Sequence, residues 1–220
     1  MRTKLAVLTA AALAAGALSS QAQSNVYSLN VVGYVSVGLT NGFNMIANPL
    51  DLDGTGTNNT IQGVFGTALP NNTAVYKFTG GGFNGFYSFT RGAWSPGANT
   101  ATLNPGEGVM LSVPSNTSFT FVGQVLQGGE TNQFITPGYS LLGSKIPLSG
   151  GLQTTLQYTP ANADQVSIFQ QSLNSGAGGY NNFTFSTRGG WSPSEPQIAP
   201  GVGFFLSTTS SSWVQNFTVQ

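Results

Sequence analysis

Cysteine and histidine are both missing from this chain of 220 residues. Without cysteine the protein has no disulfide bond and no thiol nucleophile, so its stability has to come from burial. Without histidine it has no Ser-His-Asp triad, and without either residue it has no ordinary zinc or copper site. Hydrophobic residues make up 40% of the chain and aromatic residues 11%, which is enough for a real core at this length. These absences exclude many classes of enzyme.

Charged residues are also scarce. They make up 5% of the chain, against about 25% in an ordinary soluble domain. Six basic and six acidic residues give a formal net charge of +0. A nucleic-acid-binding protein needs clustered Lys and Arg to displace counterions from phosphate, and a membrane-surface patch needs a similar basic cluster. We therefore expect no nucleic-acid partner and no polybasic membrane contact.

The start of the chain has the pattern of a cleaved export signal. Arg2 and Lys4 precede an apolar, alanine-rich run over residues 5–18, and Ser20-Gln21-Ala22 supplies the small residues that signal peptidase needs. The run is shorter than the roughly 20 apolar residues that span a bilayer. We predict a signal peptide over residues 1–22 and no membrane span after its cleavage. The mature protein is then extracellular or held at the cell surface, with the periplasm as an alternative.

The mature part of the chain is an internal duplication. Residues 31–123 match residues 121–220 along their whole length and in the same order. Each copy of about 90 residues falls in the ordinary size range of a domain. We place copy 1 at residues 23–124 and copy 2 at residues 125–220, directly joined, because segment 118–126 closes one and opens the other. The matching stretches are VGYV (32–35) with VGQV (122–125), GFNMIANPL (42–50) with GYSLLGSKIPL (138–148), AVYKF (74–78) with QVSIF (165–169), NPGEGVMLSV (104–113) with APGVGFFLST (199–208), and SFTFVG (118–123) with NFTVQ (216–220).

Each copy has the sequence pattern of a β domain. Short alternating or apolar runs rich in Val, Ile, Phe, Tyr and Thr recur between clusters of Gly, Pro and Asn that favour turns. Only residues 58–69 and 154–164 are compatible with a helical turn or a short helix. We predict an all-β fold of two tandem small barrels or sandwiches, with at most a short helix in each.

An arginine beside a tryptophan occurs once in each copy, as TRGAWSP (90–96) and TRGGWSP (187–193). In one interpretation these are inherited corners of the fold: Gly permits a turn, Pro fixes the exit, and the indole is an apolar plug with the arginine laid across an aromatic face. In another, the indoles are exposed platforms for a sugar face, and two such sites add avidity. A protein–protein contact is a third. The candidate ligand-binding residues are Arg91, Trp94, Tyr87, Arg188, Trp191 and Tyr180.

One loop partly matches a calcium-binding loop. In DLDGTGTNNTIQ (51–62), Asp51, Asp53 and Thr55 stand at ligand positions, and a glycine stands at the turn. The bidentate glutamate that closes such loops is replaced by Gln62, and copy 2 loses both aspartates. The alternative is a solvated Asp/Gly turn. Calcium is the one cofactor that this sequence suggests.

The remaining acids give no sign of a catalytic pair. A glycosidase needs two carboxyl groups roughly 5–10 Å apart across a cleft. Glu107 aligns with Val202, and Glu195 has no acidic counterpart in copy 1. We therefore expect no enzymatic activity. The stretches NPGEGVML and APGVGFFL predict instead a Pro-Gly turn that leads into a strand, in which the second glycine allows another backbone to come close.

Three stretches of copy 1 resemble a family of exported bacterial proteins associated chiefly with the Verrucomicrobia. They are NVVGYVSV (30–37), GFNMIANPL (42–50) and LNPGEGVMLSVP (103–114). The second half continues the resemblance in GYSLLGSKIPLSGG (138–151) and GGWSPSEPQIAPGVGFFL (189–206), so it covers essentially the mature chain. The resemblance implies secretion and a two-copy β architecture, and it supplies no catalytic residues.

Three functions follow from these patterns. The first is a secreted, non-enzymatic structural or adhesive protein of the cell surface or extracellular matrix, since natural sheets blunt their edges with charge and this chain has almost none. Its partners would be itself or other envelope or matrix proteins. The alternative is a carbohydrate-binding module that uses the Arg/Trp corners and takes glycans as partners. A hydrolase using Glu107 or Asp51 is the third.

Overall fold

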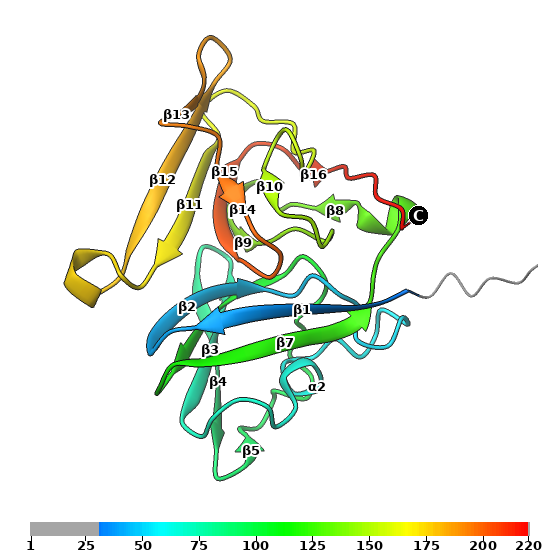
Figure 1. The fold of residues 1–220 in the computed structure, drawn as a ribbon, viewed down its shortest axis with the longest axis vertical. Coiled ribbons are helices and arrows are strands. Elements are labelled where there is room, and N and C mark those ends of the chain that lie inside the picture. Colours follow the sequence, from blue (N-terminus) through cyan, green and yellow to red (C-terminus); the bar gives the residue numbers. More distant parts are fainter. Residues whose placement is uncertain (1–30, 220) are drawn as a thin grey trace, which may run out of the picture.

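The computed structural model describes residues 31–219, so the predicted signal peptide over residues 1–22 lies outside the described residues. Within residues 31–219 the fold is all-β with one short α-helix, as the sequence predicts. It consists of two tandem β domains, which we call copy 1 and copy 2 and divide at the boundary predicted above. Figure 1 shows the two copies packed against each other, with the five-stranded sheet of each meeting near the middle of the molecule.

Each copy contains a five-stranded antiparallel sheet, and the order of the strands is the same in both. From one edge to the other, copy 1 has β2 (Gly42–Ala47), β6 (Gly108–Val113), β3 (Thr73–Thr79), β4 (Gly82–Thr90) and β5 (Ala93–Trp94). Copy 2 has β9 (Gly138–Leu142), β15 (Phe204–Thr208), β11 (Gln165–Gln170), β12 (Gly179–Ser186) and β13 (Gly190–Ser192). The sequence correspondence assigns each strand to the one at the same place in the other sheet. The duplication in sequence is therefore also a duplication of topology.

A two-stranded ribbon accompanies each sheet, and its length differs between the copies. The ribbon of copy 1 pairs β1 (Val32–Leu39) with β7 (Thr117–Gln124) over their whole length. The ribbon of copy 2 pairs β8 (Gln133–Phe134) with β16 (Ser212–Trp213) over two residues. The shorter elements are β10 (Gly150–Gly151) paired with β14 (Gln197–Ile198), and the 3₁₀ turns η2 (Gly128–Thr131) and η3 (Asn174–Gly176).

The register of the ribbons corrects one sequence correspondence. Val37 lies opposite Phe119 in copy 1, and Gln133 lies opposite Trp213 in copy 2. Trp213 is 1% exposed and fills the core of copy 2, as Phe119 helps to fill that of copy 1. The match of residues 118–123 with 216–220 was therefore wrong. The sequence alignment paired Phe119 with another phenylalanine, whereas the residue at the same place in the ribbon of copy 2 is Trp213.

The helix α2 (Ile61–Phe65) lies in the first of the two predicted helical stretches. The Thr60 side chain caps it by accepting a hydrogen bond from the Gly63 N–H at 2.9 Å, and Ile61 and Phe65 are buried. In copy 2, the stretch 154–164 forms turns and no helix. A single helical turn is enough here because its role is to present two apolar side chains to the core.

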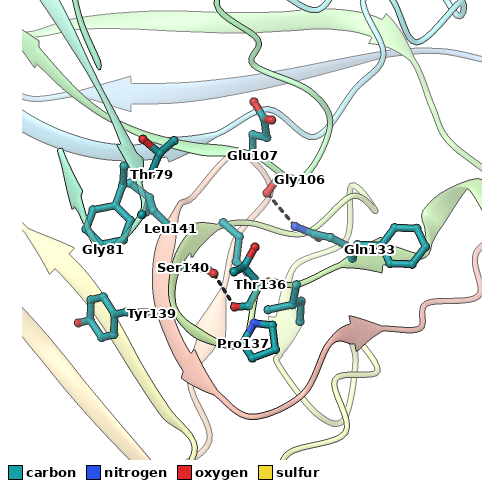
Figure 2. A pocket seen from close by; sticks show the side chains of 15 residues that line it. Thr79, Gly81, Gly106, Glu107, Gln133, Thr136, Pro137, Tyr139, Ser140 and Leu141 are labelled. Carbon is teal, nitrogen blue, oxygen red and sulfur yellow. Dashed lines mark hydrogen bonds between the residues drawn. The ribbon is translucent and has the colours of Figure 1, made fainter. Parts of the chain in front are cut away.

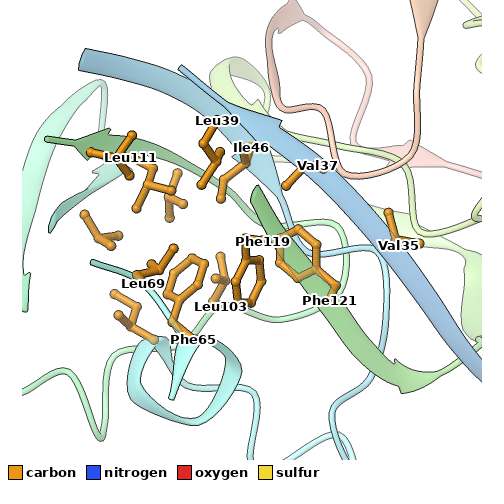
Figure 3. Packing of buried hydrophobic residues seen from close by; sticks show 14 of the residues in the cluster. Val35, Val37, Leu39, Ile46, Phe65, Leu69, Leu103, Leu111, Phe119 and Phe121 are labelled. Carbon is orange, nitrogen blue, oxygen red and sulfur yellow. The ribbon is translucent and has the colours of Figure 1, made fainter. Parts of the chain in front are cut away.

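The core of copy 1 lies between its ribbon and its five-stranded sheet. Figure 3 shows side chains of β1 and β7 meeting Leu111 of β6 and Phe65 of α2. Alternate residues of β1 are buried, as expected of a strand with one face in solvent. Val35, Val37 and Leu39 therefore point inward, and Tyr34 and Ser36 point outward.

The strands next to the edge, β6 and β15, are buried on both faces. In β6, Val109 and Leu111 enter the core of copy 1, and Met110 between them faces copy 2. In β15, Phe205 faces copy 1 in the same way. Met45, Met110, Leu141 and Phe205 form a separate buried cluster where the copies meet. The apolar run GVML, which lacks polar alternation, is typical of a strand that is buried on both faces.

The contact between the copies has approximate two-fold symmetry. Ile46 of copy 1 bridges Val202 of copy 2, and the corresponding residues Leu142 and Glu107 form the mirrored bridge. The Ala47 N–H donates to the Gly201 carbonyl at 3.0 Å, and the Gly143 N–H donates to the Gly106 carbonyl at 3.0 Å. Each copy therefore presents the same surface to the other, as in an isologous dimer.

The second glycine of each Pro-Gly turn is required by this contact. A Cβ on Gly108 would lie 2.9 Å from Leu141 Cγ and 3.0 Å from Leu142 N. A Cβ on Gly203 would lie 2.7 Å from the Ile46 carbonyl oxygen. The close backbone approach expected from the sequence is thus an approach of one copy to the other.

Candidate functional site

The two Arg/Trp corners are hairpins that end the five-stranded sheets. In copy 1, Arg91 and Gly92 form a two-residue loop between the paired Thr90 and Ala93, and both have positive φ, of 54° and 77°. This is the backbone of a type I′ turn, in which glycine at the second position avoids strain. The strand that follows, β5, is two residues long and precedes Pro96. A short edge strand that ends near proline blocks further pairing at the edge of the sheet.

The corner of copy 2 reaches the same end by a different turn. Ser186 pairs with Gly190 across a three-residue loop that contains Arg188. Gly190, which follows the loop and pairs with Ser186, has a φ of 73°, a left-handed conformation that glycine adopts without strain. The additional glycine in TRGGWSP therefore supplies the position that the longer loop requires.

Both indoles are half-buried against the core of their own copy. Trp94 stacks on Phe65 with ring centroids 5.9 Å apart, and its Nε1 donates to the Gly66 carbonyl at 2.7 Å. Trp191 packs edge-on against Phe185 at 5.3 Å. Its Nε1 is buried and has no hydrogen-bond partner within residues 31–219. The two indoles thus share a position but differ in the state of their one polar atom.

The other candidate ligand-binding residues do not join the tryptophans in one surface. Arg91 and Arg188 are exposed, and neither makes the expected aromatic contact in the described part of the chain. Tyr87 packs half-buried against the core of copy 1. Tyr180 lies at the opposite end of β12 from the strand pair that holds Trp191, beside Phe169 at 5.4 Å. The corners themselves, at β5 and β13, lie at opposite ends of the molecule (Figure 1).

The calcium-like loop is held by its own hydrogen bonds. Asp51 is 5% exposed; its Oδ1 accepts from Asn59 Nδ2 at 2.8 Å and its Oδ2 from the Gly56 N–H at 2.9 Å. The exposed Asp53 accepts from Asn58 Nδ2 and from the Thr55 N–H and hydroxyl. These hydrogen bonds, those of Asn58 first, hold the pKa of Asp53 below its ordinary value. The loop oxygens therefore stabilise a turn, and calcium binding stays a prediction.

The other carboxylates also hold turns. Glu107 forms an ion pair with Lys77 at 3.1 Å and accepts from the Asn104 N–H at 3.0 Å, which closes the Pro-Gly turn of copy 1. Glu195 accepts from the N–H groups of Gln153 and Thr154 at 2.6 and 2.7 Å. Each of these acids thus orders local backbone.

Asp164 has a similar role in the interior of copy 2. It is 2% exposed and accepts from the Tyr158 hydroxyl at 2.6 Å and from the Ala161 N–H at 2.7 Å. Burial, and then the hydrogen bond to Asp164, raise the pKa of Tyr158. No group of three or more acidic residues within residues 31–219 is arranged to hold a metal ion.

No helix in the described residues combines the length and the apolar character that a membrane crossing requires.

A wide cavity lies between the two copies. The wide groove, as we call it, has a volume of about 580 Å³ and is lined by residues of segments 78–81, 106–107 and 133–142. Figure 2 shows Glu107 and Gln133 on one side of it and Tyr139, Ser140 and Thr136 on another. Gln133 Nε2 donates to the Gly106 carbonyl at 2.9 Å, and the Ser140 hydroxyl donates to the Thr136 carbonyl at 3.0 Å. These bonds fix the floor and rim of the groove.

A second cavity is the symmetry counterpart of the first. The narrow groove has a volume of about 300 Å³ and is lined by residues of segments 36–38, 43–46, 169–171 and 199–202. These segments correspond to those of the wide groove in the sequence duplication. Sequence reasoning missed both grooves because they form between copies. The one available signal was the difference between the segments that follow AVYKF and QVSIF, which are TGGG in copy 1 and QQSLNSGAGG in copy 2.

Comparison of the chain with models of known protein families, with curated proteins and with solved structures finds no match to any of them.

Proposed function

We propose that this chain is an exported, non-enzymatic structural or adhesive protein of the cell surface or extracellular matrix, and that it associates with itself through the ribbon of β1 and β7. The observation that carries the proposal is the composition of that ribbon. None of the residues of β1 and β7 is charged, and the ribbon pairs with the rest of the described chain only at the bridge between Gln124 and Asp51.

The outer face of the ribbon is apolar at one end. Val32, Tyr34 and Val122 are 58%, 72% and 46% exposed, and Tyr34 lies directly opposite Val122 in the register. Toward the other end, the hydroxyls of Ser36 and Thr120 hydrogen-bond across the strands at 2.8 Å. An exposed apolar patch on a neutral ribbon favours contact with another surface over solvent.

The outer edges of the ribbon point to the same conclusion. Natural edge strands are protected by Lys, by proline or by shortness. The edge strands β5 and β13 are short and near proline, whereas β1 and β7 are long and contain neither lysine nor proline. Residues 23–220 contain four basic and six acidic residues, so their formal net charge is 4 − 6 = −2, and the general repulsion that would keep two ribbons apart is weak.

The roles of the carboxylates support a non-enzymatic function. Glu107, Glu195 and Asp164 each accept hydrogen bonds from the turns they stabilise. The lining of the wide groove contains Glu107 as its one acid, so this groove does not hold the pair of carboxyl groups that a glycosidase needs. Glu107 is neutralised by Lys77.

Sedimentation of residues 23–220 over a range of concentrations tests the association. We expect reversible oligomers at high concentration, and we expect Tyr34→Lys and Val122→Glu each to shift the chain to monomer, because a charge on the patch repels its copy. Asn99→Lys, which adds a charge to an exposed turn elsewhere, is the matched control and leaves association unchanged. A chain that remains monomeric at every concentration and never sediments with cell envelopes contradicts the proposal.

A further inference from the structure

The two grooves between the copies differ in their lining: the narrow groove contains the side chain of Gln171, which has no counterpart in the wide groove. Gln171 begins the long loop between β11 and β12 and reaches across to copy 1. Its Oε1 accepts a hydrogen bond from the Phe43 N–H at 3.0 Å, and its Nε2 donates to the Gly176 carbonyl at 2.6 Å. A carboxamide thus completes the outer edge of β2.

The wide groove has the same backbone donor without that carboxamide. Tyr139 corresponds to Phe43, and its N–H points away from β15 because the Gly143 N–H, on the same edge of the strand, donates to Gly106. The hairpin in the place of the Gln171 loop is Gly80–Gly81, which has no side chain. Within residues 31–219 no side chain accepts from the Tyr139 N–H. The edge of β9 is therefore left open at this point.

A second polar group in the lining of the wide groove also lacks a partner. Gln133 is 7% exposed, and its Oε1 has no hydrogen-bond partner in residues 31–219. The corresponding residue in the narrow groove is Val37, which has no such group. A buried acceptor without a donor is unfavourable. The wide groove therefore offers an open donor at Tyr139, the counterpart of the Phe43 N–H that Gln171 satisfies in the narrow groove, while the unpaired Gln133 oxygen is buried behind its lining.

The walls of the wide groove are aromatic and carry no net charge. Phe134 is 93% exposed, and Tyr139 and Phe78 lie edge to face with ring centroids 6.0 Å apart. The one acid, Glu107, is paired with Lys77. An uncharged ligand with an apolar side chain next to its amide fits this lining better than an ion does.

We propose that the wide groove binds a short, extended, uncharged peptide that presents a glutamine side chain, and that its carboxamide takes the place that Gln171 occupies in the narrow groove. A peptide is favoured over a glycan for two reasons. The counterpart donor, the Phe43 N–H, is already satisfied by a side chain of a peptide segment, that of Gln171, and the inner part of the β9 edge is already bridged by a peptide segment at Glu107. This inference stands whether or not the ribbon mediates self-association.

The natural probe is the occupant of the narrow groove itself. A synthetic peptide of residues 169–176, FQQSLNSG, is titrated into ¹⁵N-labelled residues 23–220, and the backbone amide signals are followed by NMR. We expect saturable shifts at Tyr139 and Ser140, with a dissociation constant on the order of 1 mM, as befits so small a contact. The same peptide with Gln171→Leu is the control, and we expect it to bind at least about tenfold more weakly, since a carboxamide hydrogen bond is lost.

Two variants of the protein test the geometry. Phe134→Ser removes an aromatic ring that lines the wide groove and is exposed to solvent, so we expect weaker peptide binding and an unchanged melting temperature. Tyr34→Ser removes an exposed aromatic ring elsewhere and is the matched control, so we expect it to leave peptide binding unchanged. Gln171→Gly removes the carboxamide from the narrow groove and frees the Phe43 N–H. In that variant we expect the peptide to shift the Phe43 amide as well, as a second site.

Four outcomes overturn the proposal. One is the absence of any shift at Tyr139 up to about 10 mM peptide, tenfold above the expected dissociation constant. Another is equal binding of the glutamine and leucine peptides. The third is a shift produced by a trimer of N-acetylglucosamine and not by the peptide, which would make the groove a glycan site. A Phe43 amide that stays unmoved in Gln171→Gly contradicts the equivalence of the grooves on which the inference rests.

Discussion

Copy 1 and copy 2 share their buried parts and differ in their exposed ones. The five strands have one order in both sheets, and the bridge of Ile46 to Val202 is mirrored by that of Leu142 to Glu107. The ribbon, by contrast, pairs over eight residues in copy 1 and over two in copy 2. The hairpin after the central strand is Gly80–Gly81 in copy 1 and a loop over residues 171–178 in copy 2.

This difference shows where a specific function has room to evolve. A change in the shared sheets alters a core or the mirrored contact, so it is opposed by packing. A change in the ribbon or in the hairpin alters a surface and leaves the sheets intact. The patch at Tyr34 lies on the ribbon, where the copies diverge, and the edge at Tyr139 is open because the hairpin beside it differs from the loop whose Gln171 closes the corresponding edge at Phe43.

The largest effect is expected at the residues that close the two cores. Phe119→Ala and Trp213→Ala each remove a large buried ring, and each should lower the free energy of unfolding by about 3–5 kcal/mol. Urea denaturation measures both. Phe217→Ala is the informative comparison, because the sequence correspondence makes Phe217 the counterpart of Phe119 and the structure leaves it only partly buried. If Phe217→Ala lowers the free energy of unfolding as much as Trp213→Ala does, the result would support the pairing of Phe119 with Phe217 that the sequence alignment gives.

The mirrored contact between the copies predicts that substitutions at Gly108 and Gly203 lower the free energy of unfolding by equal amounts. Gly108→Val and Gly203→Val each place a side chain against the backbone or side chains of the other copy, and each should destabilise the protein by about 1–3 kcal/mol. Gly189→Val is the control, since a Cβ at Gly189 meets nothing within 4 Å and its φ is not positive. Strongly unequal costs for the two glycines would show that the contact is less symmetric than its hydrogen bonds.

A buried tyrosine in copy 2, Tyr158, predicts that the melting temperatures of the protein and of its Tyr158→Phe variant depend differently on pH in the alkaline range. The pKa of Tyr158 is raised by burial, so its contribution to stability is complete below pH about 10, the ordinary tyrosine value, and declines as the pH rises above it. Tyr158→Phe should cost about 1–3 kcal/mol near neutral pH, since Asp164 loses a donor. It should also flatten the fall in melting temperature above pH about 10. Equal slopes in the two proteins would contradict the assignment.

The sequence predicted the parts of the fold that depend on local pattern and on the repeat. The stretch NPGEGVML predicted a turn that leads into a strand, and the alignment of AVYKF with QVSIF placed the central strands of both sheets. The second glycine of each Pro-Gly turn was expected to allow a close approach, although the approaching backbone, that of the other copy, was not identified.

The grooves could not be predicted in the same way, because they depend on how one copy meets the other. Nothing in the letters around Gln171 indicates that its amide reaches Phe43 in another sheet. Trp213 was missed for a related reason: it replaces Phe119 by volume and position, while an alignment compares residue types. Both cases need the register of the strands, which a single sequence does not supply.

The smallest predicted difference is between the two corner tryptophans. Trp94→Phe loses ring volume and the hydrogen bond from Nε1 to the Gly66 carbonyl, whereas Trp191→Phe loses ring volume and an indole N–H that has no partner within residues 31–219. The volume term is common to both, so the difference between the two variants isolates the hydrogen bond. We expect Trp94→Phe to be the more destabilising by about 1 kcal/mol in urea denaturation. Equal costs would mean that the Trp191 N–H is satisfied in solution and that the corners are equivalent. A glycan that accepts a hydrogen bond from the Trp191 indole would also make the two costs equal. Repeating the urea denaturation with and without added glycan distinguishes this case, because only a bound glycan makes the cost of Trp191→Phe depend on the added sugar.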